Sequence, residues 1–142
     1  MDQIKKEYQY YLYKYIGAEL FIEKKLDMDE SSNLLLIKLI GYYKQASKEF
    51  ENAYDIESLN DIFYKYKIVM NETVDLYITT YCDTNKISYE KIKYNEYLIN
   101  NRKLVNIEDG FTYTCKTLNK IARRKKMVRT FLQDVKDVVK FR

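Results

Sequence analysis

The scarcity of helix-breaking residues is the strongest constraint on this fold, because the 142-residue chain has no proline and only three glycines. An average composition of about 5% proline would place about seven in a chain of this length. Proline removes a backbone donor and glycine lowers helix stability, so a chain nearly free of both is most simply helical. The length is typical of one domain, and no linker or repeat divides it. We therefore predict an all-α fold in which residues 1–142 form a single helical domain.

Apolar residues at three- and four-residue spacing predict three helices in the first part of the chain. The first is expected at residues 2–25, the second at 32–52 and the third at 59–81. Ser58 resembles the cap of the third helix, because an acid follows three residues later. Gly41 lies inside the second helix, where glycine is costly, and we expect it to mark a close helix crossing.

The pattern weakens after the third predicted helix. We expect a short helix at residues 88–99 that frays at Asn100-Asn101. Residues 103–115 have two interpretations: a hairpin of residues 104–107 with 111–115, or the start of the last helix. We favour the helix, because the second run continues the later apolar stripe and an isolated hairpin is marginally stable. The result is a single-domain antiparallel bundle of four to five helices, ending in a long basic C-terminal helix.

The last quarter of the chain combines an apolar stripe with most of the positive charge. Residues 116–142 carry a net charge of +8, whereas residues 1–115 carry −4. One arc of about 100° on the helical wheel holds Leu118, Ile121, Val128, Leu132, Val135 and Val139. Lys125 also falls in this arc, so we expect it to direct its ammonium group outward or to mark an imperfect seam. Such charge asymmetry favours a polyanionic or acidic partner.

The candidate binding residues are cations of this last helix: Lys116, Lys120, Arg123, Arg124, Lys126 and Arg129. Positive charges within a few helical turns can neutralise phosphates and release counterions, which gives salt-sensitive binding without sequence preference. The chain has no standard base-reading motif, so we expect contacts to the backbone of a nucleic acid. The same cluster can bind an acidic protein surface, and charge runs are often only the solvated face of a packed helix.

Sixteen tyrosines form the main aromatic load, and they are densest near the N-terminus. Tyr8, Tyr11 and Tyr15 occupy the face of the first helix that is expected to be core, whereas Tyr10 and Tyr13 lie outside it. Rings beside lysines can stack on unpaired bases. Tyr10 and Tyr13 are therefore a candidate aromatic interface, although packing is the favoured role of the tyrosine cluster as a whole.

Enzymatic chemistry has little support in this sequence. The chain has no histidine, which removes the usual general base and the commonest metal ligand. Cys82 and Cys115 are too far apart for a zinc motif, and the glycines do not form a phosphate-binding loop. We therefore expect no enzyme, no metal and no cofactor.

Isolated cysteines and the lack of an apolar leader or bilayer-length apolar run predict an intracellular protein without membrane insertion. We expect both thiols to be reduced, with a Cys82–Cys115 disulfide as the alternative.

The leading functional prediction is a non-enzymatic protein that binds nucleic acid or a nucleoprotein through its basic C-terminal helix. Residues of A/T-rich codons are abundant, which suggests a viral, phage or mobile-element accessory protein in the cytoplasm or host cell interior. The alternatives are a protein-binding adaptor or inhibitor that engages an acidic partner, and a homo-oligomeric structural subunit.

Overall fold

The computed structural model describes residues 1–16 and 30–140, with side chains as far as Gln133 and at Val135. These residues form four α-helices, a three-stranded antiparallel sheet and a short 3-10 turn. The elements in chain order are α1 (Asp2–Tyr13), α3 (Glu30–Asn52), α4 (Ile56–Thr84), β1 (Tyr89–Lys93), β2 (Glu96–Ile99), β3 (Lys103–Asn106), η1 (Ile107–Asp109) and α5 (Phe111–Lys140). The chain is mostly helical, as predicted, but the sheet shows that the all-α prediction was wrong.

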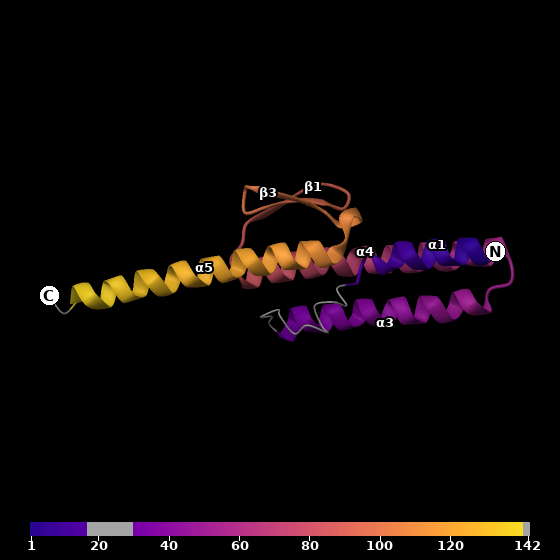
Figure 1. The fold of residues 1–142 in the computed structure, drawn as a ribbon, viewed down its shortest axis with the longest axis horizontal. Coiled ribbons are helices and arrows are strands. Elements are labelled where there is room, and N and C mark those ends of the chain that lie inside the picture. Colours follow the sequence, from indigo (N-terminus) through magenta and orange to yellow (C-terminus); the bar gives the residue numbers. More distant parts are fainter. Residues whose placement is uncertain (17–29, 141–142) are drawn as a thin grey trace.

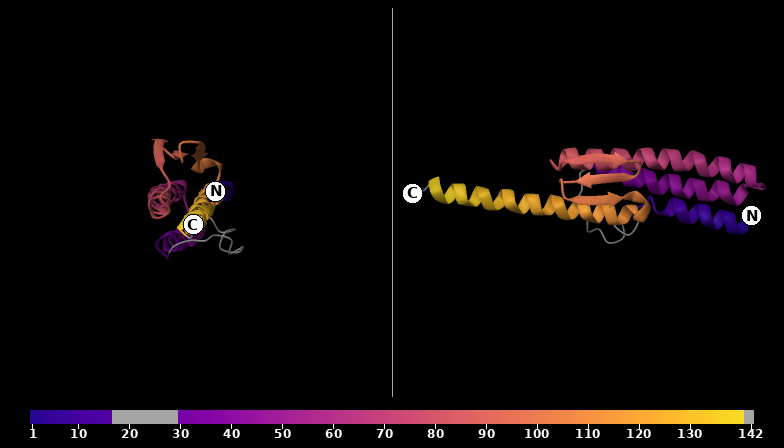
Figure 2. Two further views of the ribbon diagram at one scale, coloured as in Figure 1. Left: turned by 90° about the vertical axis from the view of Figure 1, so that its left-hand side faces the viewer. Right: turned by 90° about the horizontal axis from the view of Figure 1, so that it is seen from above.

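The helices lie along one long axis (Figure 1). α3 and α4 form an antiparallel pair, and α1 packs against both. α5 begins where α1 ends, so these two helices follow one another along the molecule (Figure 2). The junction is held by the Phe111 amide, which donates to the Lys14 carbonyl at 2.8 Å. The Thr112 hydroxyl donates to the Ile16 carbonyl at 3.2 Å.

Aromatic side chains build the contact between α1 and α4. Tyr8 stacks on Phe63 with ring centroids 4.1 Å apart, and Tyr11 meets the same ring edge-on at 5.3 Å. Tyr15 is buried. The tyrosines predicted for the core face of the first helix therefore do pack inward, as expected of rings that bury their faces and keep a hydroxyl at the edge.

The first helix is shorter than predicted, because α1 ends at Tyr13 and not at residue 25. Tyr15 and Ile16 donate to carbonyls three residues back, which tightens the chain into a turn. The Lys14 carbonyl accepts from the Phe111 amide at the start of α5. Residues 17–25 of the predicted helix lie outside the described residues.

Two predictions about α3 and α4 are also corrected. α4 begins at Ile56 and its cap is Asp55, whose carboxylate accepts from the Ser58 amide at 2.7 Å, so Ser58 is not the cap. Gly41 in α3 is exposed, and a Cβ added there would meet nothing within 4 Å. Gly41 therefore does not mark a close helix crossing.

The predicted helix at residues 88–99 was wrong, because this segment forms β1 and β2. Three asparagines with positive φ lie in the turns between the strands: Asn95 (63°) between β1 and β2, and Asn100 (57°) and Asn101 (59°) between β2 and β3. Asparagine tolerates this left-handed conformation better than most residues. β2 pairs with β1 and also with β3, so the third strand that we did not expect is supplied by residues 103–106.

The two interpretations of residues 103–115 are each partly wrong. The hairpin of residues 104–107 with 111–115 is not formed, since β3 pairs with β2. The last helix does include the second run, but it begins only at Phe111, after η1 and a Gly110 with φ of 116°.

The first half of α5 is anchored on α4, whereas its second half extends beyond the other described elements (Figure 1). Phe111, Cys115 and Leu118 are fully buried, and Phe111 meets the Tyr77 ring edge-on at 5.2 Å. Farther along the predicted stripe, Val128 is 58% exposed, and Leu132 and Val135 are exposed as well. The stripe is thus buried only as far as Ile121, because α4 ends at Thr84. The side chain of Val139 lies outside the described residues.

Two further findings bear on the expectations above. Cys82 and Cys115 are both free thiols and both buried. In the described ranges, no helix carries an apolar stretch of the length needed to cross a bilayer.

Candidate anion-binding groove

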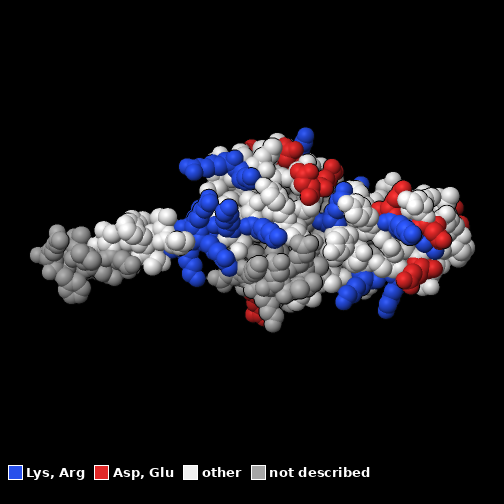
Figure 3. Space-filling view, in the orientation of Figure 1, with Lys and Arg blue, Asp and Glu red and all other residues white. Residues whose placement is uncertain are grey.

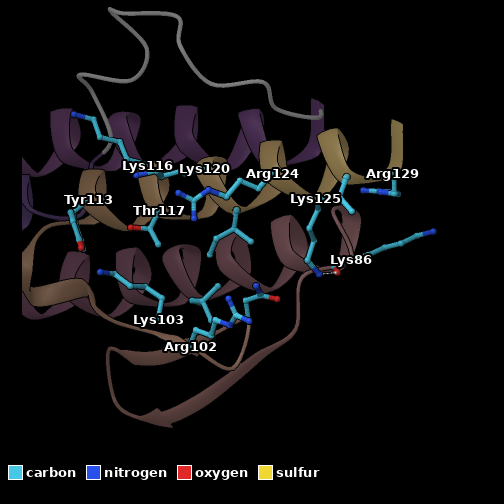
Figure 4. A pocket seen from close by; sticks show the side chains of 14 residues that line it. Lys86, Arg102, Lys103, Tyr113, Lys116, Thr117, Lys120, Arg124, Lys125 and Arg129 are labelled. Atoms are coloured by element: carbon cyan, nitrogen blue, oxygen red, sulfur yellow. Dashed lines mark hydrogen bonds between the residues drawn. The ribbon is translucent and has the colours of Figure 1, made fainter. Parts of the chain in front are cut away.

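A groove of about 930 Å³ lies between the first half of α5, the β2–β3 turn and the end of α4 (Figure 4). Its lining residues are Lys86, Ile99, Asn100, Arg102, Lys103, Tyr113, Lys116, Thr117, Lys120, Ile121, Arg124, Lys125, Val128 and Arg129. Eight of these described lining residues are Lys or Arg, and none is Asp or Glu. Figure 3 shows Lys and Arg gathered over this region, whereas acidic and basic side chains are mixed at the α1 end of the molecule.

α5 supplies one wall of the groove. Lys116, Lys120 and Arg124 recur every four residues, so they lie one above another along one side of the helix. Ile121 and Val128 lie beside this row and form part of the apolar floor. The helical spacing therefore brings a row of cations and a strip of apolar surface into the same groove.

The turn between β2 and β3 supplies the opposite wall. Asn100 and Asn101 both have positive φ, and the Arg102 amide donates to the Ile99 carbonyl at 3.2 Å, as in a type I′ turn. The Asn100 amide also donates to the Ser88 carbonyl at 2.7 Å. These backbone bonds fix the turn, so that Arg102 and the following lysine are presented opposite α5 (Figure 4).

Lys86 closes one end of the groove, at the C-terminus of α4. The Ile87 amide donates to the Cys82 carbonyl at 2.8 Å and the Lys86 amide to the Asp83 carbonyl at 3.3 Å. This pair of bonds is a Schellman motif, in which Lys86 takes the left-handed position with φ of 55°. The Lys86 carbonyl accepts a hydrogen bond from Lys125 Nζ at 2.7 Å.

That bond accounts for the lysine found inside the apolar arc of the last helix. The Lys125 side chain runs along the groove and carries its ammonium group to the backbone at the end of α4 (Figure 4). Its stem is partly buried while its charge reaches a polar partner. Lys125 therefore directs its charge away from the apolar arc, as we expected, and also ties α5 to α4.

The pKa of Tyr113 is affected by the positive charge of the groove. Lys103 Nζ lies 5.7 Å from the centroid of the Tyr113 ring. A hydrogen bond from Lys103, together with its charge, lowers the pKa of the Tyr113 hydroxyl below its ordinary value. The direction follows because a nearby cation favours the phenolate form. The ring itself is 49% exposed and forms part of the lining.

Four of the six cations predicted as binding residues line the groove: Lys116, Lys120, Arg124 and Arg129. Arg123 and Lys126 are exposed on α5, but they are not among the residues that line it. The predicted basic face of α5 is therefore divided: four of its cations line the groove, and Arg123 and Lys126 lie outside the groove.

The two tyrosines predicted as an aromatic interface belong to α1 and do not line the groove. Tyr10 is exposed, and Lys14 Nζ lies 5.5 Å from its ring centroid. Tyr13 packs edge-on against Tyr43 with centroids 5.7 Å apart. Neither ring is brought near the cationic cluster by the fold.

Sequence reasoning missed seven lining residues that carry charge or hydrogen-bonding groups: Lys86, Asn100, Arg102, Lys103, Tyr113, Thr117 and Lys125. Lys86 and the turn residues lie far from α5 in the sequence, so charge counting in one segment does not find them. The available signal was the Asn100-Asn101 pair between two β-prone runs, which is a hairpin sequence.

No family model, curated protein sequence or solved structure matches this chain. Among the described residues, no group of three or more His, Cys, Asp or Glu side chains is arranged to hold a metal ion.

Proposed function

We propose that this chain is a non-enzymatic protein that binds nucleic acid by holding its phosphate backbone in the groove between α5 and the β2–β3 turn. The observation that carries the proposal is the lining itself, in which eight Lys or Arg residues from three parts of the chain border one groove without a carboxylate among the described residues. A polyanion offers several negative charges to such a cluster at once.

The extent of the cluster favours a polymer over a small anion. Along α5 the groove runs from Tyr113 to Arg129, a span of roughly 24 Å at 1.5 Å per residue. Cations spread over such a length can contact several successive phosphates, and each contact releases counterions. We therefore expect affinity that falls steeply as salt concentration rises.

Binding of labelled DNA and RNA across a salt series tests the proposal. Arg102→Gln/Lys103→Gln removes two groove cations on the turn, and Lys44→Gln/Lys48→Gln removes two exposed cations on α3 as a matched control. We expect the turn variant to bind more weakly with a shallower salt slope, and the α3 variant to behave like the wild type. Absence of binding at low salt, or equal losses in the two variants, would contradict the proposal.

A second candidate function is supported by the exposed apolar side chains on the second half of α5: Met127, Val128, Phe131, Leu132 and Val135. Monomeric proteins rarely expose such a continuous apolar strip without use. Residues 116–129, which lead into this strip, carry seven Lys or Arg and no Asp or Glu, whereas Asp134 lies near its far end. The complementary partner is therefore an amphipathic helix of another protein with acidic residues opposite the start of the strip.

An acidic amphipathic peptide tests this adaptor function directly. Met127→Gln/Phe131→Gln should weaken its binding while leaving nucleic-acid binding in the groove unchanged. Sedimentation over a range of protein concentrations provides the comparison with a homo-oligomeric subunit. Self-association that the same variant abolishes would replace the acidic partner with a second copy of this chain.

A further inference from the structure

We infer that the groove takes a single nucleic-acid strand whose bases contact Tyr113 and the apolar floor; this inference rests on the function proposed above. The positive charges of the groove predict contact with phosphates only, and this inference adds contact with the bases. Three features of the groove carry it: an apolar floor, cations on two facing walls and an aromatic ring at one end.

The floor of the groove is apolar between its charged walls. The exposed part of this apolar surface comes from Ile121 and Val128 of α5, since Ile99 of the sheet borders the groove but is itself fully buried. A duplex keeps its base faces stacked inside and presents phosphates and sugars, so it gains little from an apolar floor. A single strand has unpaired bases, which bury their faces on apolar and aromatic side chains.

The walls carry cations that face one another across the groove. Lys120 and Arg124 lie on the α5 side, whereas Arg102 and Lys103 lie on the side of the turn (Figure 4). A volume of about 930 Å³ is in the range of pockets that hold small ligands and short segments of a chain. One strand lying between these walls would meet cations on both sides.

Tyr113 supplies the aromatic surface. Its ring is half exposed and lies at the groove end nearest the start of α5. Lys103 Nζ occupies a position 5.7 Å from the ring centroid. A bound strand offers that ammonium a phosphate and offers the ring a base, so one nucleotide satisfies both groups.

The test compares three probes of equal length: a thymidine oligonucleotide, an abasic strand with the same phosphates, and a duplex. For the wild type we expect the thymidine strand to bind at least about fivefold more tightly than the abasic strand, since stacking of one base contributes that much or more. We expect Tyr113→Leu to reduce this ratio toward one and Tyr113→Phe to retain it. Tyr54→Leu, which changes an exposed tyrosine outside the groove, should leave the ratio unchanged.

The outcomes separate this inference from the proposed function. Equal binding of thymidine, abasic and duplex probes, with a steep salt slope, would overturn base contact and leave phosphate binding in place. A preference for the thymidine strand that Tyr113→Leu does not change would overturn the role of Tyr113. No binding of any probe at low salt would overturn the proposed function itself.

Discussion

Lys125 Nζ donates a hydrogen bond to the Lys86 carbonyl at 2.7 Å, joining two groove residues that are 39 positions apart in the sequence. The bond connects the middle of α5 to the left-handed residue that ends α4. Two elements that carry cations are thereby held at a fixed separation. The site depends on how α4 ends as much as on the charge of α5.

Replacement of Lys86 should separate fold stability from binding. Lys86 has φ of 55°, which costs an L-residue about 1–2 kcal/mol. Lys86→Gly should therefore raise the free energy of unfolding by about 1 kcal/mol. It should change nucleic-acid binding little, because Figure 4 shows the Lys86 ammonium directed away from the other groove residues and only the Lys86 carbonyl bonds to Lys125.

Lys86→Gln is the matched control, since it removes the charge and keeps the strained backbone. Urea unfolding and strand binding, measured for both variants, check the prediction. If the glycine variant is no more stable than the glutamine variant, Lys86 is not strained as the structure indicates.

Gly41→Ala should stabilise the protein. The position is an exposed part of α3, and the added Cβ would meet no atom within 4 Å. Alanine in a helix interior is favoured over glycine by about 1 kcal/mol. Thermal and urea unfolding should show that gain, whereas Ala46→Gly, at a buried position of the same helix, should destabilise. A loss of stability in Gly41→Ala would indicate a neighbour that packs against this face.

Both thiols should be unreactive in the native state. Burial raises the pKa of Cys82 to about 12, and burial also raises the pKa of Cys115 above its ordinary value. The thiolate is the reactive form, and neither side chain is accessible. Thiol-reactive dye should label no cysteine in the folded protein and both in denaturant. If neither cysteine is labelled in denaturant without reductant, the protein contains a Cys82–Cys115 disulfide.

The cap of α4 should make stability depend on pH in acid. The Asp55 carboxylate accepts hydrogen bonds from the Ser58 hydroxyl, which has the larger effect, and from the Ser58 amide. Both bonds lower the pKa of this carboxyl group. Because the pKa of Asp55 in the folded protein lies below the unfolded value of 3.8, ionised Asp55 stabilises the folded state fully at pH values above 3.8. This stabilisation is lost as the pH falls through the pKa of the folded state.

Asp55→Asn keeps an equally good cap that does not titrate. Its urea midpoint should therefore fall less steeply than that of the wild type between about pH 5 and about pH 2. Identical slopes for the two proteins would show that Asp55 does not contribute to the acid sensitivity.

The sequence predicted α3 and α4 best, because long helices with a regular apolar face are specified locally. It did not predict the sheet, because the turns between its strands are made by asparagines with positive φ and not by glycine. It also did not predict which half of the α5 stripe is buried. Leu118 and Leu132 have the same periodicity, and only the length of α4 decides that one is covered and the other exposed.

The groove was only half predictable for a related reason. Lys120 and Arg124 were found because they belong to one charged segment. Lys86 and Arg102 join them only through a helix cap and a hairpin turn, neither of which charge counting considers. Tertiary structure, and not local pattern, selects which cations form the site.

The most direct test compares two pairs of cations on the same helix. Lys120→Gln/Arg124→Gln removes charge from the groove, whereas Arg123→Gln/Lys126→Gln removes the same charge from exposed residues that do not line it. Circular dichroism should show equal helicity in both variants. The measurement is the dependence of the logarithm of the binding constant on the logarithm of salt concentration, for a single-stranded probe. We expect the groove pair to lower the slope by about 0.7 for each lost phosphate contact and the other pair to leave it nearly unchanged. Equal changes in the two variants would contradict the groove and assign binding to the overall charge of α5.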